Sequence, residues 1–178
     1  MTRTALRLAE DENPGSLFIH GVCGLGKTHL LHGLMHHYQT RQPRATVRYT
    51  TAEAFTNEFI TAVRANKIDA FRKSYRRVEL LCIDDVHFLA NKEATQTELM
   101  HTLDAVGLDG ARVAFASDES PRDIRKLSEK LVSRFMSGMV ARIDAPDTEL
   151  RVKLVRHLAQ RRSLRLEETA VKLIAERS

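Results

Sequence analysis

Cysteine and long apolar runs are both scarce in this sequence of 178 residues. The two cysteines, Cys23 and Cys82, stand in very different sequence contexts, so we do not expect a disulfide framework and predict a reducing, cytoplasmic compartment. No apolar run approaches the roughly 20 residues that a helix needs to span a bilayer, and no charged and then apolar leader opens the chain. These absences argue against a disulfide-rich secreted domain and a membrane-spanning protein.

The bulk composition is that of one globular domain. Hydrophobic residues make up 43% of the chain and charged residues 29%, which is unlike a disordered or a membrane protein. A chain of this length holds one domain with a real core but is short for two. The net charge of +5 leans towards an anionic partner, which leaves open a nucleotide, a nucleic acid or no partner at all.

Short apolar runs alternate with amphipathic stretches along most of the sequence. Between the runs, apolar residues recur at helical spacing, as at Leu99, Leu103 and Val106. Strands separated by helices predict βαβ units, and therefore a parallel sheet with helices on both faces. We expect an α/β fold with three αβα layers and a five-stranded parallel sheet, its strands near residues 17–19, 47–50, 80–83, 113–116 and 139–143.

Two polar patterns predict where helices begin. Thr50, with Glu53 three residues later, matches a capping box. Ser120 before Pro121 suits an N-cap followed by proline at the first helical position. The helix after the first pattern is expected to present one apolar face, formed by Phe55, Phe59, Ile60 and Val63.

A glycine-rich segment follows the first predicted strand. Residues 21–28 read GVCGLGKT and fit the phosphate-loop pattern G-x-x-x-x-G-K-[ST] in full. Glycines let backbone amides converge on phosphate oxygens, and the helix that follows directs its positive N-terminal end at the same phosphates. We expect Lys27 to reach the β- and γ-phosphates and the Thr28 hydroxyl to ligate magnesium. A chance glycine-rich turn is the alternative, which the flanking strand and helix disfavour.

Acidic residues end two of the predicted strands. Asp84 and Asp85 follow the apolar run 80–83, at the carboxyl end of a strand, where open parallel sheets bind their ligands. Asp84 is the better candidate for magnesium, directly or through water, and Asp85 for orienting or deprotonating the attacking water. Ser117 and Asp118 end the next strand, where a polar side chain can sense the γ-phosphate. The alternatives are an acidic turn at the first position and a helix N-cap cluster at the second.

Beyond these motifs, the chain resembles the ATPase domain of the bacterial DnaA replication initiators, from about residue 13 to the end. Residues 24–32 look like the family's phosphate loop and helix, and residues 51–59 like its next strand–helix unit. Residues 83–89 resemble its acidic strand end, with His87 where the family usually has glutamine. Ser117-Asp118 and residues 133–135 fall in the expected order.

The resemblance implies an AAA+ P-loop fold with ATP or ADP and magnesium bound between neighbouring subunits. The implied magnesium ligands are Thr28 and Asp84. Arg134 matches the arginine finger that acts in trans on the next subunit's ATP, and Lys130 lies where many relatives carry a second arginine. The implied catalytic residues are Lys27, Asp85, Asp118 and Arg134. The implied nucleotide-binding residues are Gly21, Gly24, Leu25, Gly26, Lys27, Thr28 and His29.

DNA contacts are also implied by the resemblance. Residues 51–77 correspond to the family's helical insertion, which steers assembly and grips single-stranded DNA. Ile60, Lys92 and Thr95 are the implied DNA residues. Ala94 departs from the family, which usually has an arginine there, so we expect one phosphate contact fewer and a salt dependence flatter by about one unit of slope or less.

The resemblance further implies an organisation. Residues 1–12 form a poorly defined lead-in, residues 13–146 the nucleotide-binding core, and residues 147–178 the beginning of a helical lid. The rest of the lid, with its ATP-sensing arginine, and the domain for duplex DNA are expected to lie outside this chain, as are any contacts with a replicative helicase.

Three functions are compatible with these residues. The first is an initiator switch that binds ATP, assembles with copies of itself, engages origin DNA and hydrolyses ATP slowly. The second is an AAA+ helicase loader whose partner is another protein. The third is a regulator that binds ATP without hydrolysing it, which the complete set of acidic and basic site residues disfavours.

Two other clusters have both a functional and a structural interpretation. Basic residues interleaved with aromatics predict either a single-stranded DNA patch or a helix with a core side and a solvated side; we favour the helix. These residues are Phe71, Arg72, Lys73, Tyr75, Arg76 and Arg77. Histidines at helical spacing allow a metal site, but no carboxylate or cysteine nearby completes one. These are His29, His32 and His36.

Overall fold

The computed structural model describes residues 15–177 and divides into two compact units between Ile143 and Asp144. The first unit is built on a five-stranded sheet of order β2-β3-β4-β1-β5. All four neighbouring pairs are parallel. The strands are β1 (Ser16–His20), β2 (Val47–Thr51), β3 (Leu80–Asp84), β4 (Arg112–Ser117) and β5 (Met139–Arg142). The predicted parallel sheet of five strands is confirmed.

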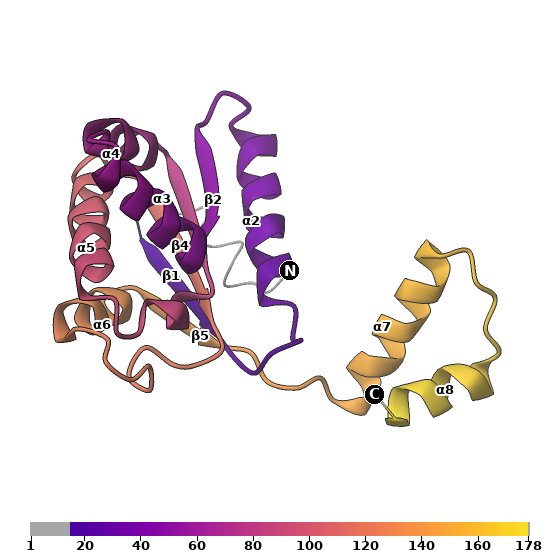
Figure 1. Ribbon diagram of the computed structural model, residues 1–178. Helices are drawn as coiled ribbons and strands as arrows, with labels where there is room; N and C mark the ends of the chain where they lie inside the picture. The colour runs from indigo at the N-terminus through magenta and orange to yellow at the C-terminus, as the bar shows by residue number, and fades with distance from the viewer. Residues whose placement is uncertain (1–14, 178) are drawn as a thin grey trace. The chain divides into compact units, whose positions relative to one another are not determined.

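Helices cover both faces of this sheet, as Figure 1 shows. Among the described helices of this unit, α2 (Lys27–Arg41) covers one face. The other face carries α3 (Ala52–Arg64), α4 (Ile68–Arg76), α5 (Glu93–Leu108) and α6 (Glu129–Met136), and a short 3-10 helix, η1 (Val86–Leu89), follows β3. The result is the predicted three-layer αβα arrangement.

Alternation along the central strands divides the core into two halves. Leu17 and Ile19 point to the α2 side, while Phe18 between them points to the other side. There its ring packs against Phe115 and Phe135, with centroids 6.0 and 5.2 Å away. Each central strand is therefore buried on both faces, as a parallel sheet between helices requires.

Both predicted helix starts in this unit are wrong. The N-cap of α3 is Thr51, whose side chain accepts the Ala54 amide at 3.1 Å; Thr50 still belongs to β2 and is buried there. Ser120 opens a turn, since its carbonyl accepts the amides of Asp123 and Ile124, and α6 begins only at Glu129.

The buried side chain of Gln96 on α5 holds the segment that precedes α6. Its amide group donates to the carbonyls of Leu89 and Lys126, at 2.9 and 3.0 Å, and its oxygen accepts the Ser128 amide at 2.8 Å. Lys126 takes a left-handed conformation, with φ of 57°. The segment between Ser120 and Ser128 is thus held to α5 in a non-helical path.

The helical insertion is fixed to the core by α4. Phe71 and Tyr75 are buried, so the core interpretation of this helix is confirmed. Arg72 donates to both oxygens of Glu98 on α5, at 3.0 and 2.8 Å, and Arg76 adds a third contact at 3.2 Å. Burial alone would raise the pKa of Glu98, but the two guanidinium groups lower it below its ordinary value.

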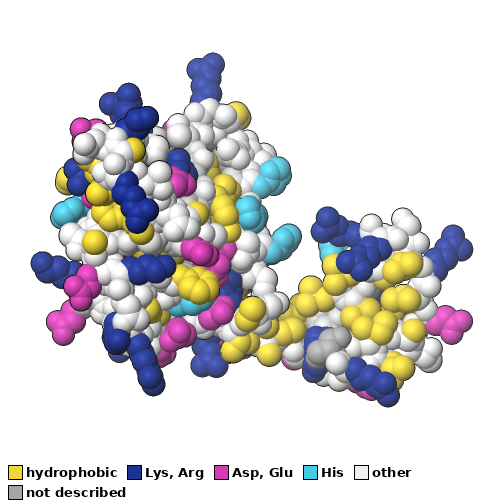
Figure 2. Space-filling view, in the orientation of Figure 1, with side chains coloured by type: hydrophobic (Ala, Val, Ile, Leu, Met, Phe, Trp, Pro, Cys, Tyr) yellow, Lys and Arg dark blue, Asp and Glu magenta, His cyan; other side chains and the backbone are white. Residues whose placement is uncertain are grey.

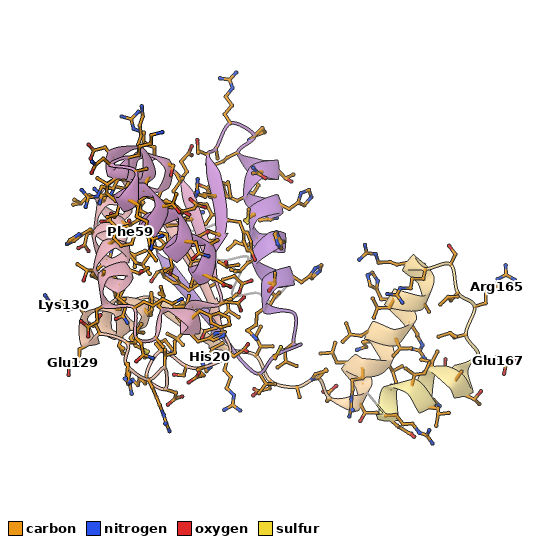
Figure 3. All side chains as sticks on the ribbon, viewed as in Figure 1. His20, Phe59, Glu129, Lys130, Arg165 and Glu167 are labelled. Atoms are coloured by element: carbon orange, nitrogen blue, oxygen red, sulfur yellow. The ribbon has the colours of Figure 1, made fainter. Side chains whose placement is uncertain are left out.

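The apolar face expected of α3 is only half buried. Phe55 is buried and Phe59 packs against the core, facing Phe71, and Figure 3 places Phe59 among the side chains of α3 and α4. Ile60 and Val63, however, are 40% and 52% exposed. These two side chains therefore remain available to a ligand.

The second unit is a pair of packed helices, α7 (Thr148–Arg161) and α8 (Glu168–Arg177). Asp147 caps α7 by accepting the Leu150 amide at 2.8 Å. Ala159, Val171 and Ala175 are buried. The division after Ile143 comes slightly earlier than the boundary expected after residue 146, and the lead-in 1–12 lies outside the described residues. Across residues 15–177, no helix is long and apolar enough to cross a membrane.

We expect Glu98→Gln to lower the free energy of unfolding by about 2 kcal/mol at neutral pH, which urea denaturation would measure. A buried ion pair broken on one side costs roughly 3–5 kcal/mol. The loss here is smaller because the two arginine side chains are 37% and 29% exposed. Asp104→Asn, on the exposed side of the same helix, is the control.

The loss of stability in Glu98→Gln should depend on pH. A lowered carboxylate pKa stabilises the fold above the unfolded pKa, about 4.3 for glutamate, and that contribution is lost as the pH falls through the folded value. The difference between the wild type and Glu98→Gln should therefore be constant near neutral pH and shrink below about pH 4.3. A difference that does not depend on pH would contradict the ion pair.

Candidate nucleotide-binding site

The phosphate loop connects β1 to α2, and its backbone path requires glycine at several positions. Gly26, immediately before α2, has φ of 81° and ψ of 23°, a left-handed conformation that favours glycine. A Cβ at Gly21 would lie 2.3 Å from the Ile143 carbonyl oxygen. No side chain caps α2, and its first turn carries no acidic residue. The amides of that turn and the positive end of the helix are therefore free to bind an anion.

Lys27 is buried at the mouth of this loop, with 6% of its surface exposed. Its ammonium donates to the carbonyls of Gly21 and Val22, at 2.7 and 3.0 Å. It also pairs with Asp118 at 2.7 Å. All three partners are oxygen acceptors, so the ammonium already lies where it can exchange one of them for a phosphate oxygen.

Parallel pairing brings the acidic strand ends to the same edge of the sheet. His20 at the end of β1 is paired with Ser117 at the end of β4, and the Gly21 amide donates to the Ser117 carbonyl at 3.3 Å. β3 lies on the other side of β4 and ends in Asp84. The predicted basic and acidic residues therefore do converge.

The two carboxylates after β3 have different surroundings. Asp84 is 1% exposed and accepts the Asp85 amide at 2.9 Å and the Tyr49 hydroxyl at 3.1 Å. Asp85 is half-buried in a left-handed conformation, with φ of 55°. Burial and the neighbouring charge of Asp84 raise the pKa of Asp85. Asp85 is thus a better proton acceptor than an ordinary aspartate, and Asp84 is held in place by two hydrogen bonds.

The donor set fits magnesium. Both groups that hydrogen-bond to Asp84 are neutral. Among residues 15–177, this buried carboxylate thus lies beside a second carboxylate without a direct cationic contact. Magnesium is usually held by one or two carboxylates together with phosphate oxygens rather than by a full protein cage. Within residues 15–177, no group of three or more His, Cys, Asp or Glu is arranged to hold a metal ion, which leaves the histidines of α2 without further ligands.

A cavity of about 650 Å³ lies over the phosphate loop, Asp85 and Asp118, within the size range of ligand sites. Of the residues predicted to bind nucleotide or magnesium, Gly21, Leu25 and Asp84 are outside its lining. The lining residues are Cys23, Gly24, Gly26, Lys27, Thr28, His29, His32, Asp85, His87, Phe88 and Asp118. Cys23, His32, His87 and Phe88 were not predicted as site residues, although His32 follows Thr28 by one helical turn, which is a recognisable spacing. Figure 2 shows histidines along the outer side of α2.

Arg134 lies at the opposite edge of the sheet. Its guanidinium donates to the Leu103 carbonyl at 3.0 Å and lies against Gly107, where a Cβ would come within 2.6 Å of it. It lines a second cavity, of about 250 Å³, together with Ser16 at the start of β1 and Gly138 just before β5. Arg134 is therefore separated from the phosphate loop of its own chain by the length of the strands. Lys130 projects from the outer side of α6 (Figure 3).

The three residues predicted to contact DNA are not equally accessible. Ile60 is 40% exposed, and Lys92 is partly exposed at the start of α5. Thr95 is only 3% exposed, because its position in the first turn of α5 faces the core. Its side chain is thus far less accessible than the other two, and its contact with DNA stays a prediction.

Comparison with known proteins agrees with this geometry. Residues 2–142 match the family described as the bacterial DnaA ATPase domain. The match begins at residue 2, so the similarity extends into the segment 1–12, which we had expected to lie outside it. The chain is 43% identical, over 175 residues and 96% of its length, to the chromosomal replication initiator protein DnaA of Enterococcus faecalis. It spans 39% of that relative.

Solved structures give the same result. Domain III of the Thermotoga maritima replication initiation protein DnaA superimposes with a TM-score of 0.93 at 36% identity, over 97% of this chain and 72% of that one. A replication initiator DnaA bound to AMPPCP and single-stranded DNA gives 0.91 at 30% identity, over 98% and 55%. The DnaC helicase loader gives 0.69 at 16% identity over 79% of this chain and 86% of that one, which shows a shared fold alone.

The phosphate loop, the parallel sheet and the family match over most of the chain thus agree, and the chain belongs to the bacterial DnaA ATPase domain family, with its AAA+ fold.

Proposed function

We propose that this chain is the ATP-dependent switch of a DNA replication initiator. It binds ATP or ADP with magnesium, and the nucleotide state controls self-assembly and the engagement of origin DNA, including single strands. The observation that carries this proposal is the separation of two half-sites. The phosphate loop, Asp85 and Asp118 share one cavity, whereas Arg134 lies at the opposite end of the strands.

The residues of the cavity have distinct roles in this proposal. The amides of the loop and the Lys27 ammonium bind the β- and γ-phosphates. Thr28 and Asp84 would hold magnesium, which supplies charge that offsets the phosphate oxygens. Asp85 orients the attacking water and accepts its proton, and Asp118 holds Lys27 and senses the γ-phosphate.

The distant position of Arg134 explains why assembly and hydrolysis would depend on each other. An arginine at the γ-phosphate adds cationic charge that is worth roughly 10³–10⁵ in rate in related phosphoryl transfers. A single chain lacks that charge in its own cavity, so it would hydrolyse slowly. A neighbouring copy supplies it only when the two are assembled around ATP.

The initiator is favoured over the helicase loader by two observations. The initiators match this chain at 30–43% identity over nearly its whole length, whereas the loader shares only the fold. The insertion α3–α4 also presents the exposed apolar side chains of Ile60 and Val63 beside Arg64. Such a surface suits bases and phosphates of a single strand.

The decisive experiment is a titration of a labelled single-stranded DNA with this chain under ATP, ADP and no nucleotide, followed by fluorescence anisotropy. We expect binding with ATP only, weakening as salt is raised, and nucleotide occupancy is checked separately. Equal or absent DNA binding in all three conditions, with ATP bound, would refute the initiator function of this chain and favour the loader.

Asp85→Asn should reduce phosphate release by about a hundredfold or more, because a general base contributes roughly 10²–10⁴ to the rate. The affinity for ATP, measured by calorimetry, should change less than about threefold. Because burial and Asp84 raise the pKa of Asp85, the wild-type rate should fall at acid pH from a point above the ordinary aspartate pKa of about 3.9. Asp109→Asn, exposed beyond the end of α5, is the control. A variant that hydrolyses ATP normally would exclude Asp85 as the base.

Arg134→Ala should leave nucleotide binding by the single chain unchanged and abolish assembly that requires ATP. Sedimentation velocity under ATP and under ADP measures the amounts of single chain and of assembly. The lost hydrogen bond to Leu103 should cost only about 1 kcal/mol of stability, and Arg122→Ala, exposed before α6, controls for the removal of a positive charge. Normal ATP-dependent assembly of Arg134→Ala would show that the finger assignment is wrong.

A further inference from the structure

Tyr49 contacts Asp84, the carboxylate proposed to hold magnesium, and the two residues belong to neighbouring strands. On the edge strand β2 it is paired with Cys82 of β3, and Asp84 lies two residues beyond Cys82. Residues two apart on a strand share a face, so all three side chains lie on the α2 side of the sheet, where Tyr49 packs against the core. The Tyr49 hydroxyl reaches along β3 and donates to Oδ2 of Asp84 at 3.1 Å.

The phenol ring is itself held in place by α2. His32 lies against it with ring centroids 4.6 Å apart and an interplanar angle of 31°. His32 follows Thr28 by one helical turn and lines the nucleotide cavity. Tyr49 is therefore fixed between the strand that carries Asp84 and the helix that carries Thr28.

The two hydrogen bonds to Asp84 use different oxygens. The Asp85 amide binds Oδ1 at 2.9 Å, and Tyr49 binds Oδ2. Together they fix the rotation of a carboxylate that is 1% exposed. The Tyr49 hydroxyl is thus the donor that holds the Oδ2 side of this carboxylate.

We propose that Tyr49 is a positioning residue for magnesium, because it fixes the orientation of the Asp84 carboxylate that would hold the metal. This proposal rests on the proposed nucleotide function of the neighbouring cavity. Groups that hold a metal ligand in this way typically contribute 10–100-fold to metal affinity. Loss of the Tyr49 hydroxyl should weaken the binding of magnesium and not that of the nucleotide itself, because Tyr49 does not line the cavity that receives the nucleotide. His32 supports the same orientation through the ring contact.

The test is Tyr49→Phe, which removes one hydroxyl and keeps the ring. ADP affinity is measured by calorimetry in EDTA and at saturating magnesium, and the ratio of the two dissociation constants gives the magnesium contribution. We expect this ratio to fall about tenfold in Tyr49→Phe, while the affinity in EDTA stays within about twofold of wild type. Phosphate release from ATP at limiting magnesium should fall in parallel and recover as magnesium is raised.

Tyr75→Phe is the matched control. Tyr75 is fully buried and its hydroxyl also donates to a carboxylate, Glu58, at 2.9 Å, but it belongs to the opposite face of the sheet. This variant should leave the magnesium ratio unchanged. His32→Ala should lower the ratio by a smaller factor, about two- to threefold, because the hydroxyl remains.

A double-mutant cycle with Asp84→Asn completes the test. If Tyr49 acts through Asp84, adding Tyr49→Phe to Asp84→Asn should lower the ratio no further. An unchanged ratio in Tyr49→Phe, or equal losses with and without magnesium together with a lowered melting temperature, would overturn the positioning role. Wild-type protein that binds no nucleotide, or binds it equally with and without magnesium, would instead refute the proposed function, and the role of Tyr49 with it.

Discussion

The parallel pairing of β1 with β4 in one fixed register is the constraint on which the nucleotide site depends. It places the Ser117 carbonyl at the Gly21 amide and lets Lys27 reach Asp118. The register is set by the core and not by the site. A slip of one residue would turn Phe18 out of its ring cluster and Leu17 and Ile19 away from α2. Hydrophobic packing on both faces therefore determines the geometry of a charged site at the edge of the sheet.

Local patterns in the sequence were enough to predict the sheet and half of the site. The run 80–83 and the loop 21–28 have strong local preferences, since a fully buried strand must be apolar and a phosphate loop must be glycine-rich. Convergence of Lys27 with Asp85 and Asp118 then follows from the parallel arrangement alone. The loop and each strand end are encoded by residues close together in the chain, and the parallel arrangement then brings them together, so the sequence alone predicts them.

The features that sequence reasoning missed all depend on distant contacts. Thr50 and Thr51 are equivalent as N-caps until Tyr75 buries the first of them. Ser120 and Pro121 carry a good local helix signal, which the side chain of Gln96 overrides from thirty residues away by holding the segment before Ser128. Tyr49 looks like an ordinary residue of a strand, and only the pairing of β2 with β3 brings its hydroxyl to Asp84.

The insertion α3–α4 shows how a rigid support can present an apolar surface. Glu98 ties α4 to α5 through two arginines, and the rings of Phe55, Phe71 and Tyr75 pack edge-on or tilted against one another. The exposure of Ile60 and Val63 is thus not a result of loose packing, because the opposite side of the same helix is well buried. Alanine at position 94 offers no cation to a phosphate. The strand contacts proposed for α3 are therefore apolar contacts of Ile60 and Val63, which salt weakens less than contacts between a cation and a phosphate.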